Sequence, residues 1–137
     1  MNKVTLFIVA LLLGFQTVDL DGHDNKAVDR SDKKIGKVLV FSGTGWYRHP
    51  ETAAISGWLA RLSDDLKMQV DVTESAKDLK LLDRYQVLVL NNSNQLTSIL
   101  DSKQRKALED WYAKGGGIVA LHAALVRQTD WPWPTKL

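Results

Sequence analysis

Short apolar runs alternate with longer amphipathic stretches over most of the chain. Four runs of five or six residues have the character of strands, and three of them are mainly apolar, as strands buried inside a parallel sheet are. They cover residues 37–42, 69–73, 86–90 and 117–121. The second run, QVDVT, alternates apolar and polar residues, which indicates an outer strand. The pattern therefore predicts four strands.

Two of the intervening stretches have the spacing of a helix. After Pro50, a residue suited to the first turn, the apolar positions to about residue 66 share one face: Ala54, Ile55, Trp58, Leu59 and Leu62. A second helix is predicted to begin at Asp101, which can form a capping box with Gln104. It should end at Gly115, because glycine accepts the left-handed conformation that follows many helices.

This order of elements predicts the fold class. Strands that alternate with helices indicate an α/β domain with a mostly parallel sheet and helices on both faces. The predicted strands and helices end at Leu121, and Pro132 and Pro134 interrupt the remaining residues. One edge of the sheet is then left open, so we expect an incomplete fold.

The first 35 residues differ in character from the rest. A positive start, Met1-Asn2-Lys3, precedes an apolar run over 4–15. A spanning helix needs about 20 apolar residues, whereas a signal peptide needs about 7–15. We predict a signal peptide over 1–18 with a weak cleavage site, a polar linker over 19–35 and a folded part over 36–137. The protein is then periplasmic or secreted with no stable membrane span, and an uncleaved N-terminal tether is the alternative.

Charge and composition exclude several classes of function. The net charge is only +2, and the chain has no Lys/Arg-rich block, so we expect no nucleic-acid partner. The chain has no cysteine. This excludes disulfides, thiolate metal sites and a cysteine nucleophile.

Candidate chemistry follows the first strand, at the end of the sheet where open α/β folds bind ligands. The sequence GTGWYRHP joins a glycine turn containing Gly45 to the start of a helix. It carries Tyr47, Arg48 and His49, which can contact a sugar or a carboxylate. In the alternative interpretation the aromatic residues only pack and His49 caps the helix.

The last predicted strand runs into His122, which two alanines follow. Small residues permit a sharp bend from strand to helix, where α/β-hydrolases carry their nucleophile. A histidine at such a bend can be a general acid/base or a metal ligand, or a structural residue bonded to a neighbouring loop. Asp130 can orient a histidine and Trp131 can stack on a sugar, although both also suit a polar turn with a packing aromatic. Asn91 can bind a ligand or simply form a turn.

Residues 37–137 resemble the ThuA-like (trehalose-utilisation) family of the class I glutamine amidotransferase-like superfamily. The features that carry the resemblance are KVLVF with the loop ending in Arg48-His49, the region of Glu74, the helix DSKQRKALEDWY before three glycines, IVALHAA, and Asp130-Trp131. The resemblance implies a flavodoxin-like three-layer α/β/α sandwich and a link to carbohydrate metabolism. The superfamily's glutaminase cysteine is absent. Family members continue with further strands, so a C-terminal truncation is expected.

We therefore expect an exported domain that acts on or binds a small-molecule sugar derivative. His49, His122 and Asp130 are the candidate catalytic residues, and the substrate contacts are Gly45, Tyr47, Arg48, Asn91 and Trp131. The alternatives are a non-catalytic carbohydrate-binding module and an inactive truncated fragment. Two histidines and an aspartate can hold a metal with open positions, but the sequence identifies neither a metal nor a cofactor.

Overall fold

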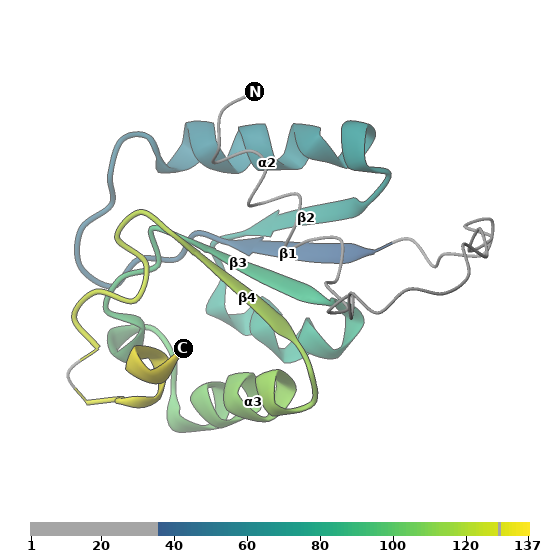
Figure 1. The fold of residues 1–137 in the computed structure, drawn as a ribbon. Coiled ribbons are helices and arrows are strands. Elements are labelled where there is room, and N and C mark those ends of the chain that lie inside the picture. Colours follow the sequence, from purple (N-terminus) through teal and green to yellow (C-terminus); the bar gives the residue numbers. More distant parts are fainter. Residues whose placement is uncertain (1–35, 129) are drawn as a thin grey trace, which may run out of the picture. The chain divides into compact units, whose positions relative to one another are not determined.

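A four-stranded sheet forms the middle of the domain that the computed structural model describes, residues 36–128 and 130–137 (Figure 1). All strands are parallel, in the order β2-β1-β3-β4. Their bounds are β1 Lys37–Phe41, β2 Gln69–Thr73, β3 Val87–Asn91 and β4 Gly117–Leu121. Each bound lies within one residue of the predicted run. The predicted signal peptide and linker lie outside the described residues.

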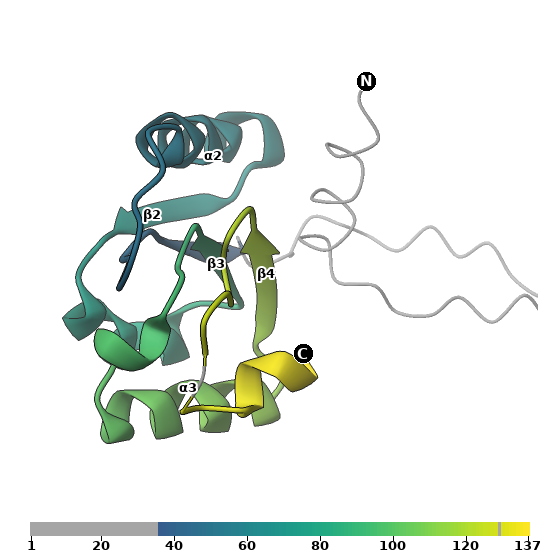
Figure 2. The ribbon, with the colours of Figure 1, turned by 90° about the vertical axis from the view of Figure 1, so that its left-hand side faces the viewer.

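Helices cover both faces of this sheet. Figures 1 and 2 show α2 (Thr52–Leu66) on one face, with α3 (Ser102–Ala113) and the 3₁₀ helix η1 (Ala76–Arg84) on the other. Two short 3₁₀ helices, η2 (Leu96–Ser98) and η3 (Trp133–Lys136), complete the described part. The domain is thus the three-layer α/β/α sandwich expected, although η1 was not predicted as a helix.

The predicted ends of α3 are confirmed. The Asp101 side chain accepts a hydrogen bond from Gln104 N at 2.8 Å, and Gln104 Oε1 accepts one from Asp101 N at 2.9 Å. This is the capping box, which pairs two amide groups that the helix leaves free. After the helix, Gly115 has φ +99° and donates to the Tyr112 carbonyl at 2.9 Å.

The buried face of α2 differs from the predicted one. Its buried residues are Thr52, Ser56 and Leu59, whereas Ala54 and Trp58 are exposed. The helix begins above the polar ends of β1 and β3, where Ser56 bonds the side chains of Ser42 and Asn91. Hydrogen bonding at this end decides which side of the helix faces the sheet, and apolar spacing alone does not reveal it.

The two central strands bury different side chains on their two faces, because successive residues of a strand point in opposite directions. The aligned residues of β1 and β3 are valines on one face: Val38, Val40, Val87 and Val89. The other face carries larger side chains that join the core with η1 and α3: Leu39, Phe41, Leu88 and Leu90. The larger side chains therefore face the layer that contains η1 and α3.

The order of strands also fixes where a site can form. The chain leaves β1 toward β2 on one side and later adds β3 on the other side of β1. Ligands of open α/β folds bind at such a reversal, beyond the carboxyl ends of the strands. At the far side β4 pairs only with β3 among the described residues, so its outer edge has no strand partner there. None of the helices in residues 36–128 and 130–137 has the length and hydropathy that a bilayer-spanning segment requires.

Candidate functional site

Two loops meet at the reversal between β1 and β3: residues 43–49 and residues 92–98. Gly45 N donates to the Asn94 carbonyl at 3.0 Å. A Cβ added at Gly45 would overlap the Ser98 hydroxyl and the Gln95 carbonyl oxygen. Contact with a neighbouring loop therefore explains why a residue without a side chain is needed at Gly45.

Buried asparagines clamp the first loop. Asn94 Oδ1 accepts from the backbone N–H groups of Trp46 (3.1 Å) and Tyr47 (3.3 Å), and its Nδ2 donates to the Tyr47 carbonyl at 2.7 Å. Asn92 Nδ2 donates to the same carbonyl and to the Thr52 hydroxyl, both at 3.2 Å. Both asparagines are almost wholly buried. This role of Asn92 and Asn94 was not predicted from the sequence.

Asn91 lies deeper than expected of a ligand contact. It is fully buried, and its Nδ2 donates to the Thr52 carbonyl and the Ser56 hydroxyl, both at 2.9 Å. Its Oδ1 has no hydrogen-bond partner among the described residues. The side chain holds the first turn of α2 on the sheet, so we leave it out of the ligand contacts proposed below.

The structure brings the two predicted histidine loops together. The rings of His49 and His122 pack edge to face, with centroids 4.2 Å apart and planes at 80°. The Tyr47 ring adds a second edge contact to His49, at 4.6 Å and 89°. His122 is exposed and His49 is half-buried, so both imidazoles reach solvent. We call these two residues the histidine pair.

The backbone at His122 makes the predicted sharp bend, because its φ is +56°. This left-handed conformation is uncommon outside glycine. The chain does not continue into a helix but into turns over 122–127, where Leu125 (φ +68°) and Arg127 (φ +61°) are also left-handed. The bend therefore leads into a loop packed beside residues 92–98, with Gln95 N donating to the Val126 carbonyl at 2.8 Å.

Arg48 faces an acidic partner from the loop after β2. Its guanidinium donates to Glu74 Oε1 at 2.5 Å and to the Ser42 carbonyl at 3.3 Å. The two charged side chains are 40% and 61% exposed, so the ion pair contributes little to stability. It does place the guanidinium at the ends of β1 and β2, beside the loop that carries His49.

The two C-terminal candidates lie away from the histidine pair. Trp131 is only 5% exposed, donates from Nε1 to Glu109 at 2.6 Å and stacks on Trp133 at 5.4 Å. This packing fixes the C-terminal segment on α3 and leaves no free indole face for a sugar. Asp130 is exposed and makes no hydrogen bond to either histidine among the described residues. Nor does that part of the chain gather three side chains suited to a metal ion.

Trp46 and Arg127 were not among the predicted site residues. Trp46 is 61% exposed, and the Arg127 guanidinium lies 4.4 Å from the centre of its ring. A tryptophan beside polar candidates was the available signal, but packing was the only role considered for it, in the alternative interpretation of the loop.

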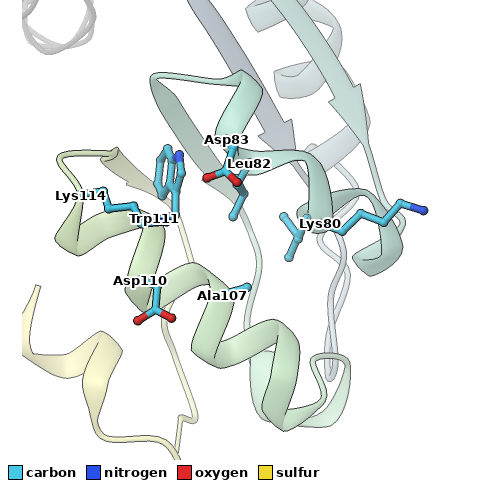
Figure 3. Close-up of a pocket in the computed structure, with 8 residues that line it drawn as sticks. Lys80, Leu82, Asp83, Ala107, Asp110, Trp111 and Lys114 are labelled. Carbon is cyan, nitrogen blue, oxygen red and sulfur yellow. The ribbon is translucent and has the colours of Figure 1, made fainter.

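A separate groove of about 200 Å³ lies between η1 and α3 (Figure 3). Charged and apolar side chains line it, among them Lys80, Asp83, Asp110 and Trp111. No residue of the histidine loops contributes to it. Because this groove lies away from both loops that carry the histidines, and two histidines from distant loops meet at 4.2 Å, the histidine pair is the stronger candidate site.

Comparisons with known proteins add a family. Residues 37–137 match the sequence model of the ThuA family, described as trehalose utilisation. Among solved structures, that of a protein described as ThuA-like from Bacteroides uniformis matches with a TM-score of 0.58 and 22% identity, which shows a common fold. The match covers 74% of this chain but only 42% of that protein. The search of curated proteins found no match.

Proposed function

Because this chain belongs to the ThuA family of trehalose utilisation, we propose that its domain binds a sugar derivative at the histidine pair and transfers protons to and from it. The observation that carries the proposal is the 4.2 Å contact between His49 and His122, which come from loops far apart in the sequence. The family supports the class of ligand, and the geometry supports the atoms that would act on it.

The histidine pair suits acid/base chemistry. Imidazole changes its charge between about pH 5 and 8. Acid/base chemistry at the pair requires one ring that carries an extra proton and one neutral ring. The neutral ring can accept a proton from a sugar hydroxyl while the charged ring donates one to another oxygen. The number of protons on the pair is then unchanged, and the two rings have exchanged roles.

The backbone at His122 supports the same assignment. Sparsely populated conformations cost about 1–3 kcal/mol and gather at active sites, where the surroundings hold them in place. Here the left-handed φ of His122 turns the chain at the end of β4. An ordinary extended residue would continue along the strand direction, so the strained turn is what allows the ring to meet His49.

Tyr47 and Arg48 are proposed to bind the polar atoms of the sugar. Tyr47 is 49% exposed and its ring packs against that of His49, so it borders the proposed reacting groups. Export, indicated by the apolar N-terminal run, would place the substrate outside the cytoplasm. N-terminal sequencing of protein recovered from the periplasm tests the proposed export. Protein found in the cytoplasm with its N-terminus uncleaved would contradict it.

The main test replaces His122 in the whole chain and measures conversion of trehalose and related disaccharides by chromatography. Loss of an acid/base group should lower turnover by about 10²–10⁴-fold. His122→Gly should do this without loss of unfolding free energy, because glycine adopts φ +56° without strain. His23→Ala is the control, because it removes the remaining one of the chain's three histidines.

Two results would contradict the catalytic role. One is a folded His122→Gly protein with wild-type turnover. The other is saturable sugar binding without conversion, insensitive to His122→Gly, which would favour a non-catalytic carbohydrate-binding module instead. The exposed Trp46 and Tyr47 side chains support this second candidate function, because exposed aromatic rings can stack on a sugar without any proton transfer.

A further inference from the structure

An exposed row of rings extends from the histidine pair. It runs Trp46, Tyr47, His49, His122, with successive centroid distances of 6.3, 4.6 and 4.2 Å. At its outer end Trp46 is 61% exposed, the most exposed of the large hydrophobic side chains described. A contiguous group of exposed aromatic rings is more informative than a single exposed residue, and such rings are suited to stacking.

A free positive charge lies at the same end of the row. The Arg127 guanidinium sits 4.4 Å above the Trp46 ring, a cation–π contact that orients it. Within the described residues it has no salt bridge, whereas Arg48 is neutralised by Glu74. Its place is fixed from the backbone, because the preceding residue, Val126, accepts the hydrogen bond from Gln95.

We propose that Trp46 and Arg127 form a subsite for the negatively charged group of a sugar ligand, a carboxylate or a phosphate. This inference rests on the proposed sugar site. The planar guanidinium presents paired N–H donors that match either oxyanion. The indole beneath it offers a face to the sugar ring that carries the charge. The histidine pair then acts further along the row, so the subsite selects the ligand and does not react with it.

Titration calorimetry on the whole chain tests this with three probes at equal ionic strength: glucose, glucuronate and glucose 6-phosphate. At least one anionic probe should bind roughly tenfold tighter than glucose. The probe that gains identifies the group as carboxylate or phosphate. The gain should shrink as salt is added, since Arg127 is at the surface.

Substitutions assign the gain to the subsite. Arg127→Gln should abolish the preference for the anionic probe and leave glucose binding unchanged. Arg61→Gln makes the same charge change on the exposed side of α2 and should alter neither. Trp46→Leu should weaken all probes, whereas Trp58→Leu, on α2, should not.

The possible failures are distinguishable. Equal binding of all three sugars overturns the anionic subsite and leaves the proposed sugar site standing. A preference that survives Arg127→Gln also overturns it. Absence of binding by any probe overturns the sugar site itself, and the subsite with it.

Discussion

Replacing Gly45 by alanine measures how tightly the two site loops are packed. The added Cβ would lie well inside 3.0 Å of both the Ser98 hydroxyl and the Gln95 carbonyl oxygen. A serine side chain can rotate away, but a backbone carbonyl cannot. The loops must therefore separate by about 1 Å, as in an overpacked core.

The expected cost follows from what that separation disturbs. Overpacking of this kind costs about 1–3 kcal/mol. The shift also stretches the hydrogen bond from Gly45 N to Asn94 and those from the next two amides to the Asn94 side chain. Each lost bond costs about 0.5–1.5 kcal/mol. We expect the unfolding free energy to fall by about 2–4 kcal/mol, a large part of the 5–15 kcal/mol typical of a domain.

Urea unfolding followed by circular dichroism measures this change. Gly57→Ala is the matched control, because its Cβ would meet only Arg61 Nη1, at 3.7 Å, in the interior of α2. That variant should gain about 0.5–1 kcal/mol. Wild-type stability for Gly45→Ala would refute the reasoning. So would full rescue of Gly45→Ala by Ser98→Ala, since the obstacle would then be the side chain alone.

Two further predictions concern other elements. Burial and the hydrogen bond to Asp71 raise the pKa of Tyr85 above its ordinary value. The stability that the neutral phenol contributes is therefore complete below about pH 10, and it is lost as the pH rises through the folded-state pKa. Tyr85→Phe should therefore flatten the alkaline fall in unfolding free energy above about pH 10, and an unchanged fall would contradict this. Asp101→Ala should cost about 1 kcal/mol through loss of the helix cap. Ser102→Ala, one position on, is its control, and equal urea midpoints for the two would argue against the cap.

The strands of the sheet were predictable because both faces of β1 and β3 are buried, which requires continuous apolar runs. The ends of α3 were predictable because capping depends on neighbouring residues alone. By contrast, η1 was missed. Its buried residues, Leu79 and Leu82, are three apart, as suits three residues per turn. A single pair of buried positions is too short a pattern to predict a helix from the sequence.

The meeting of His49 and His122 was predictable from topology, since parallel strands end at one edge of the sheet. Which tryptophan is exposed near the site, Trp46 or Trp131, was not predictable from the sequence. Trp131 is buried because it donates a hydrogen bond to Glu109 on α3 and stacks on Trp133 in η3. Trp46 is exposed because Asn94 binds its backbone N–H group while its ring points into solvent. Both outcomes depend on contacts between distant residues, which no local pattern contains.

The residues that position the site loops differ from those proposed to contact the ligand. Asn92, Ser93 and Asn94 are buried and satisfied, with Ser93 donating to the Phe41 carbonyl at 2.9 Å. Removing such a partner leaves buried polar groups unpaired, which costs about 1–3 kcal/mol each. The side chains at Tyr47 and His122 reach solvent and bear little of the packing. Substitutions at the exposed positions can therefore change what is bound without unfolding the loops. Substitutions at the asparagines lower stability and displace the histidine pair together, so loss of function there does not identify a ligand contact.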